Sequence, residues 1–210
     1  MRILSHRGYW KQPEEKNKPS AFHRSFSLGF GTELDLRDYC GKLVVSHDIA
    51  DSTCLEFDSV LELYCEHDKE LYIAINIKAD GLHKQLSSLL KKYNIENHFV
   101  FDMSVPDALG YLNYQIKAFT RQSEFEAQPS FYEQADGVWM DEFNGHWITA
   151  HEVNRHLENG KNVCIVSPEL HRRDHLSVWK DYKVFSRADN ADKLMLCTDL
   201  PEEAKEYFND

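Results

Sequence analysis

The sequence lacks the features that mark an exported or a membrane-spanning chain. It has no charged start followed by a short apolar segment, and no apolar run of about 18 residues occurs in it. Its five cysteines are odd in number and scattered, without a CxxC pair, so neither a disulfide framework nor a zinc site is indicated. We therefore expect a chain with no transmembrane segment and with reduced thiols, located in the cytoplasm.

Basic residues are also few. The chain has 24 lysines and arginines against 35 aspartates and glutamates, which gives a formal net charge of −11. Such a chain repels the phosphate backbone of nucleic acids rather than neutralising it. We expect no nucleic acid as a partner.

Linkers, low-complexity segments and internal repeats are absent from the sequence as well. With 210 residues, of which 42% are hydrophobic, the chain is long enough to bury one core of ordinary size. The sequence therefore predicts a single domain spanning residues 1–210.

What the chain does contain is a regular alternation of extended apolar runs with segments of helical spacing. The predicted strands are Arg2–Ser5, Thr32–Arg37, Leu71–Lys78, His98–Met103, Gln115–Thr120, Gly137–Met140, Asn162–Val166 and Lys193–Cys197. The predicted helices are Pro19–Gly29, Phe57–Glu66, Leu82–Tyr93, Pro106–Leu112, Pro129–Gln134, Thr149–Glu158, Asp174–Asp181 and Pro201–Phe208.

This alternation favours an α/β fold with a parallel sheet, and eight strands are the number that a (β/α)8 TIM barrel needs. A short hairpin strand, Leu43–Ser46, is added after the second strand. An open doubly wound sheet is the alternative, but it needs a glycine-rich phosphate turn after the first strand, which His6-Arg7-Gly8 is not. The barrel must be compact, with short loops and some outer helices reduced to single turns.

Acidic and imidazole side chains follow the first predicted strands. Glu33 and Asp35 are two residues apart in a strand, so both leave the same face and can hold a divalent cation. Residues Tyr39–Lys42 predict a hairpin turn, after which the chain returns His47 toward these carboxylates. His6 follows the first strand. In a barrel, these strand ends are where an active site is built.

Four motifs carry a resemblance to a known family. The chain resembles the glycerophosphodiester phosphodiesterases, within the phospholipase C-like phosphodiesterase superfamily, in His6-Arg7-Gly8, Glu33-Leu34-Asp35, His47-Asp48 and the closing Thr198-Asp199-Leu200-Pro201. The order, spacing and strand context of the motifs agree with the family's signature. The resemblance implies a TIM barrel and a phosphoric diester hydrolase of lipid metabolism that acts on a small phosphodiester.

The resemblance also implies a role for each site residue. Glu33 and Asp35 would bind Mg²⁺ or Ca²⁺, and His6 and His47 would act as the acid/base pair. Arg7 and Lys78 would bind the phosphate oxygens of the substrate. Hydrolysis of a phosphodiester requires these tasks: charge neutralisation, a base for the attacking hydroxyl and an acid for the leaving alkoxide.

The sequence departs from the family's pattern at Asn76, where the family carries a third metal-binding glutamate. An amide oxygen can still bind a hard cation, so we keep Asn76 in the metal set, but one negative charge is lost. Asp102, Asp141 or Glu142 could restore it. Only 30 residues separate His47 from Lys78, so the insertion by which the family selects glycerol is missing.

Two other functions stay open. In a phospholipase C/D-like lyase, a neighbouring hydroxyl of the substrate attacks the phosphorus first and forms a cyclic phosphate. In a catalytically degenerate module, Asn76 marks lost catalysis and the barrel only binds phosphorylated sugars. Retention of His6 and His47 argues against the second alternative.

Overall fold

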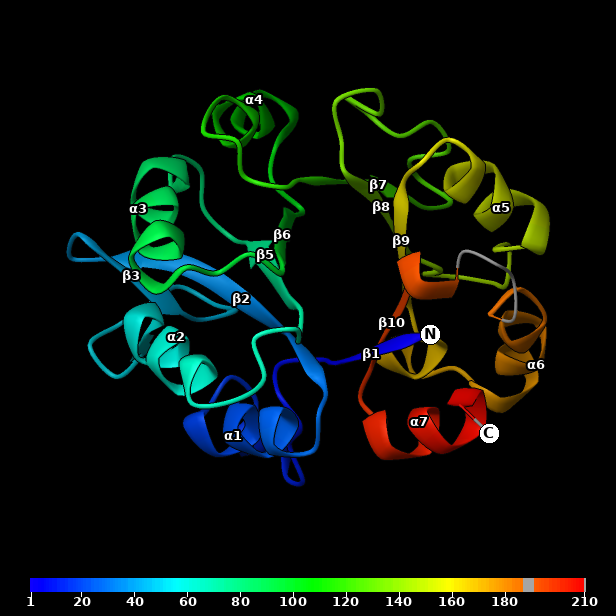
Figure 1. The fold of residues 1–210 in the computed structure, drawn as a ribbon, viewed down its shortest axis with the longest axis horizontal. Helices are drawn as coiled ribbons and strands as arrows, with labels where there is room; N and C mark the ends of the chain where they lie inside the picture. Colours follow the sequence, from blue (N-terminus) through cyan, green and yellow to red (C-terminus); the bar gives the residue numbers. More distant parts are fainter. Residues whose placement is uncertain (187–190, 210) are drawn as a thin grey trace. The chain divides into compact units, whose positions relative to one another are not determined.

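The computed structural model of the protein describes residues 1–186 and 191–209. The chain forms two compact units (Figure 1). We call Ser5–Ala118 the N-terminal unit, and Met1–Leu4 together with Phe119–Asp210 the C-terminal unit.

The N-terminal unit is built around strand β2 (Gly31–Tyr39). β2 pairs in parallel with β5 (Ile73–Ile77), which pairs in parallel with β6 (His98–Phe101). On its other side, β2 pairs antiparallel with β3 (Lys42–Val45), and β3 pairs antiparallel with the two-residue β4 (Leu55–Glu56). Every residue of β5 is buried, as expected for a parallel strand that is covered on both faces.

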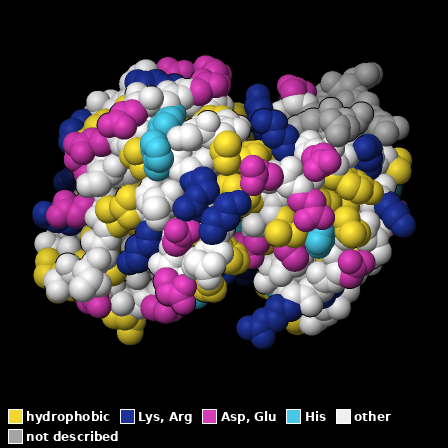
Figure 2. Space-filling view, turned by 90° about the horizontal axis from the view of Figure 1, so that it is seen from below, with side chains coloured by type: hydrophobic (Ala, Val, Ile, Leu, Met, Phe, Trp, Pro, Cys, Tyr) yellow, Lys and Arg dark blue, Asp and Glu magenta, His cyan; other side chains and the backbone are white. Residues whose placement is uncertain are grey.

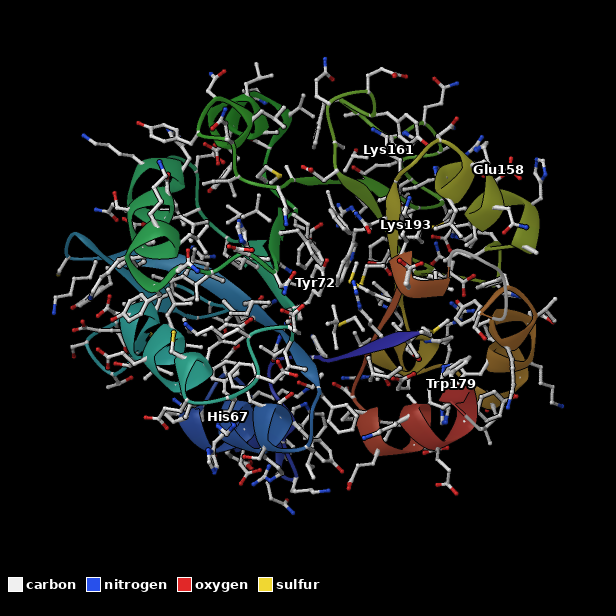
Figure 3. All side chains as sticks on the ribbon, viewed as in Figure 1. His67, Tyr72, Glu158, Lys161, Trp179 and Lys193 are labelled. Carbon is white, nitrogen blue, oxygen red and sulfur yellow. The ribbon has the colours of Figure 1, made fainter. Side chains whose placement is uncertain are left out.

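The helices of the N-terminal unit are η1 (Pro13–Glu15), α1 (Pro19–Ser27), α2 (Phe57–Cys65), α3 (His83–Tyr93) and α4 (Val105–Asn113). α1 begins with a proline, which fits the first helical turn, and it buries Ala21, Phe22 and Phe26. His67, just beyond α2 and labelled in Figure 3, has its ring against Phe26 and His23 of α1. These contacts hold α1 and α2 side by side.

The C-terminal unit has the strand order β1 (Arg2–Ser5), β10 (Leu194–Thr198), β9 (Asn162–Val166), β8 (Gly137–Met140) and β7 (Phe119–Gln122). The pairs from β10 to β7 are parallel. Its helices are α5 (Ala150–Glu158), η2 (Pro168–His171), α6 (Leu176–Phe185), η3 (Ala191–Lys193) and α7 (Pro201–Asn209). Trp179 of α6 (Figure 3) is fully buried against the ring of Phe208, and its indole donates to Ser167 beyond β9.

Most elements predicted from the sequence are present, and the hairpin after the second strand is confirmed. At its turn, Cys40 and Gly41 both have positive φ, 48° and 80°, as two-residue hairpin turns require. The start of α5 is capped by Thr149, whose hydroxyl accepts the N–H of Glu152.

Two elements differ from the prediction. The prediction of a helix at Pro129–Gln134 is wrong. Phe131 has a φ of 42°, in the left-handed region, which a helix does not allow. The segment forms a turn instead, in which the N–H of Ala135 donates to the carbonyl of Phe131. The strand predicted at Gln115–Thr120 begins later, at Phe119, and Ala118 forms only an isolated bridge to Val100.

The described residues include no helix that is both long and apolar enough to cross a membrane. On the face shown in Figure 2, acidic and basic side chains are interspersed rather than separated by sign.

Candidate active site

Asp35 lies at the centre of the candidate site, fully buried in β2. Its Oδ2 accepts a hydrogen bond from the side-chain amide of Asn17 at 2.8 Å and lies 2.9 Å from Nε of Arg7. Its Oδ1 lies 3.4 Å from the ammonium of Lys78. One carboxylate therefore contacts two cations, and the Arg7 and Lys78 side chains, 22% and 21% exposed, can both be reached from solvent.

Arg7 is fixed at two points: its side chain contacts Asp35, and its backbone contacts Glu33. It has a φ of 58°, and its N–H donates to Oε2 of Glu33 at 3.0 Å. Gly8 follows with a φ of 79°, and its N–H donates to the hydroxyl of Thr32 at 3.1 Å. A Cβ on Gly8 would lie 2.7 Å from the Cβ of Ala21, closer than atoms can pack. The glycine of His6-Arg7-Gly8 is thus required by both φ and space.

Glu33 is 2% exposed, and its carboxyl is not simply ionised. Burial, and then the charge of Asp35, raise the pKa of Glu33 to about 7, although His6, Arg7 and Lys78 pull it down. Glu33 therefore exchanges a proton near neutral pH. The same interaction shows that His6, which is half-buried, lies within electrostatic reach of Glu33.

Asn76 lies beside Asp35 on the neighbouring strand, where the two residues are register partners of β5 and β2. Within the described part of the chain, the Oδ1 atoms of Asn76 and Asp35 are both buried and accept no hydrogen bond. Buried acceptors are normally satisfied, so two unbonded oxygens on adjacent strands are unusual. Oxygen atoms of this kind are the ligands that Mg²⁺ and Ca²⁺ prefer, so Glu33, Asp35 and Asn76 fit a hard cation.

A cation bound by Glu33 and Asp35 would need the amide of Asn76 as a further ligand. Among residues 1–186 and 191–209, no three or more His, Cys, Asp or Glu side chains form a cluster that could hold a metal ion.

Lys78 and His47 are brought to the same strand end by the backbone. The N–H of Lys78, just beyond β5, donates to the carbonyl of Leu36 at 2.9 Å. The N–H of Ser46, just beyond β3, donates to the carbonyl of Asp35 at 2.9 Å. The hairpin thus returns the chain to Asp35 one residue before His47.

The His47 ring is about half exposed, and its Nδ1 lies 2.9 Å from Oδ1 of Asp48. This bond is the largest cause of the lowered pKa of Asp48. When Nδ1 carries the proton that Asp48 accepts, Nε2 keeps its lone pair and can take a proton from a reacting group.

Asp141 and Glu142, considered as substitutes for the missing carboxylate, are engaged inside the C-terminal unit. Glu142 accepts hydrogen bonds from His146, from the N–H groups of Trp147 and Ile148, and from the hydroxyl of Tyr182. Asp141 accepts from Nε2 of His171 at 2.6 Å and so raises the pKa of His171. Asp102, the third substitute, follows β6 in the N-terminal unit with a φ of 64°.

The structure brings together Arg7, Glu33, Asp35, Asn76 and Lys78, all of which the sequence predicted as site residues. Asn17 was missed. It lies in Lys16-Asn17-Lys18-Pro19, and an asparagine before a helix-starting proline looks like an ordinary turn residue. Its left-handed φ of 59° and its bond to Asp35 are visible only in the folded chain.

Comparisons with known proteins bear on the fold. No protein-family model matches the sequence, and no curated protein matches it. Among solved structures, the glycerophosphodiester phosphodiesterase from Agrobacterium tumefaciens is 14% identical over 100% of both chains, with a TM-score of 0.73. That from Thermotoga maritima is 18% identical, covering 97% of this chain and 96% of its own, with a TM-score of 0.64.

A Ca²⁺-dependent phosphatidylinositol-specific phospholipase C from Streptomyces antibioticus is 13% identical, covering 97% of this chain and 95% of its own, with a TM-score of 0.55. At this level of identity, the likenesses establish the fold. They confirm, for the fold, the resemblance predicted from the four sequence motifs.

Proposed function

We propose that this chain, which has the fold of the glycerophosphodiester phosphodiesterases, hydrolyses a small phosphodiester with the assistance of a divalent cation. The observation that supports this most strongly is the arrangement at Asp35. Two partly exposed cations and two unbonded buried oxygens converge on one strand end. Such a set can bind an anion and a hard cation next to each other.

Arg7 and Lys78 are the groups for the phosphate. A phosphodiester carries one negative charge on its two non-bridging oxygens, and a guanidinium and an ammonium can each take one of them. With Glu33 ionised, the charges of Glu33 and Asp35 balance those of Arg7 and Lys78. The balance leaves a site that accepts a cation and an anion together more readily than either alone.

His6 and His47 are the acid/base pair in this proposal. One takes a proton from the attacking water as its oxygen bonds to phosphorus, and the other gives a proton to the alkoxide that leaves. The products are a phosphomonoester and a free alcohol. The bond from His47 to Asp48 fixes the tautomer that such a proton transfer needs.

Glu33, Asp35 and Asn76 would hold Mg²⁺ or Ca²⁺. When bound, the cation would neutralise charge on the phosphate and on the attacking oxygen. Glu33 must give up its proton for binding, and its pKa of about 7 makes that possible at neutral pH.

The substrate is a small diester, of the glycerophosphodiester or sugar-phosphate type. Between His47 and β5 the regular elements of the structure are β4 and α2, which leaves little chain from which a segment that selects the alcohol could be built.

The test is turnover of glycerophosphodiesters and sugar-phosphate diesters by the purified protein, followed by phosphorus NMR with added Mg²⁺ or Ca²⁺ and with a chelator. We expect a phosphomonoester as the first product, and loss of turnover in the chelator. A cyclic phosphate as the product would select the lyase. Saturable binding without turnover of any diester would select the degenerate binding module.

Restoring the missing charge tests the cation site separately. We expect Asn76→Glu to tighten Mg²⁺ or Ca²⁺ binding by at least about 1 kcal/mol, roughly fivefold, because one unit charge at contact is worth about that much even in water. Calorimetric titration measures it. Asn113→Glu, which adds the same charge at the exposed end of α4, is the control and should leave the affinity unchanged. Tight binding by the natural protein with no gain in the variant would assign the third ligand position to another carboxylate.

A further inference from the structure

We infer that Asn17 is a positioning residue for catalysis, which sets the orientation of the Asp35 carboxylate through its side-chain amide. The inference rests on the proposed function and extends it to a residue that none of the four motifs named above contains.

Asn17 connects the loop after β1 to β2. Its N–H donates to the carbonyl of Arg7 at 2.9 Å, and its Nδ2 donates to Oδ2 of Asp35 at 2.8 Å. One residue therefore holds the backbone of the phosphate-binding arginine and the carboxylate of the cation site at once. Its φ of 59° is the left-handed conformation, which asparagine tolerates better than most side chains.

The two oxygens of Asp35 are used differently. Oδ2 is contacted by Asn17 and Arg7, whereas Oδ1 accepts no hydrogen bond and lies near Lys78. Donors on one oxygen fix the plane of the carboxylate and keep the other oxygen available. When a substrate phosphate draws Arg7 away, the amide of Asn17 is the donor that stays on Oδ2.

A neutral donor is suited to this position. An amide orients the carboxylate without cancelling its charge, so Asp35 can still attract a cation through Oδ1. A second arginine or lysine at this point would neutralise that charge and repel the cation.

The other end of the Asn17 side chain gives independent support. Its Oδ1 is buried and accepts no hydrogen bond within the described residues. A buried acceptor without a partner lowers stability. This end of the amide therefore adds nothing to stability, and the hydrogen bond of the other end to Asp35 is the contact that the Asn17 side chain makes.

Asn17→Gly is the cleanest variant, because glycine keeps the left-handed backbone and removes only the amide. We expect kcat and, by calorimetric titration, the affinity for Mg²⁺ or Ca²⁺ to fall roughly 10- to 100-fold, the usual loss when a group that orients a ligand is removed, with KM little changed. Asn94→Gly is the matched control: Asn94 has a φ of 53° at the end of α3 and is exposed, so its variant should keep the wild-type rate.

Asn17→Asp separates positioning from packing. Aspartate has the shape of asparagine but cannot donate when ionised, and it places a negative charge against Asp35. We expect a larger loss of kcat than in Asn17→Gly, because the variant loses the donor and adds a repelling charge. If Asn17 only fills space, Asn17→Asp will be the milder of the two variants.

A wild-type rate in Asn17→Gly, in a protein that turns over phosphodiesters, overturns this inference and leaves the proposed function intact. Absence of turnover in the wild-type protein overturns the proposed function and this inference with it. Measuring kcat and KM of the wild-type protein and of both Asn17 variants decides between these results.

Discussion

Replacing His6 or His47 by alanine is expected to lower kcat about 10²- to 10⁴-fold, the range that a general acid or base contributes. The free energy of unfolding should stay within about 1–2 kcal/mol of the wild-type value, because both side chains are partly or largely exposed and neither fills the core. Steady-state kinetics of His6→Ala and His47→Ala, with urea unfolding of the same proteins, measures both quantities.

The pH dependence separates the two roles. If one histidine is the base and the other the acid, kcat of the wild-type protein has a bell-shaped pH profile, and each variant loses one side of it. His151→Ala, at an exposed position of α5, is the control and should behave as wild type. A variant of His6 or His47 that keeps more than about a tenth of the wild-type rate, less than an acid or base usually contributes, would exclude the two-histidine mechanism.

The second large effect concerns stability. Glu33→Gln is expected to stabilise the cation-free protein above pH 7. The pKa of Glu33 rises from 4.5 to about 7 on folding, so the folded state prefers the neutral carboxyl. The contribution of this preference to the free energy of unfolding is fully present below pH 4.5 and is lost as the pH rises through 7. The loss is on the order of 3 kcal/mol, and the glutamine variant avoids it.

Glutamine also keeps an oxygen that can accept the N–H of Arg7, so this hydrogen bond need not be lost. Urea unfolding at pH 4.5 and pH 8 in a chelator gives the answer: wild type and variant should be alike at the lower pH and differ at the higher. Exposed Glu96→Gln should change stability by less than about 0.5 kcal/mol at both pH values. An equal effect of Glu33→Gln at both pH values would show that Glu33 does not titrate on folding as described. Turnover should fall in the same variant, because the cation site loses a charge.

The fold was predictable because its signals are local. Strand β5 is a short apolar run, β8 and β9 match their predicted bounds, and glycine and proline punctuate the turns. Parallel strands place their carboxyl ends together, so polar residues at those ends predict a site without knowledge of the tertiary contacts. This is why Arg7, Glu33, Asp35 and Lys78 could be grouped from the sequence.

What the sequence could not supply depends on contacts between distant residues. The role of Asn17 follows from a hydrogen bond across 18 positions to Asp35, and its own neighbours suggest only a turn. The turn at Pro129–Gln134 follows from the φ of Phe131, which no local preference of phenylalanine would predict. One of the hydrogen bonds to Glu142 comes from Tyr182, 40 residues further along the chain.

The segment 48–54, between His47 and β4, has a consequence for how such a site can change over evolution. It is largely exposed, with Ile49 at 89%, and its internal bonds are local, from Thr53 and Cys54 to Asp51. Doubling the length of a surface loop costs only about 0.6 kcal/mol in closure entropy. Chain inserted here would cover the strand end that carries Asp35, while β2, β5 and the groups they hold stayed as they are. A loop that selects a substrate could therefore be gained at this one point without any change in the residues that β2 and β5 hold.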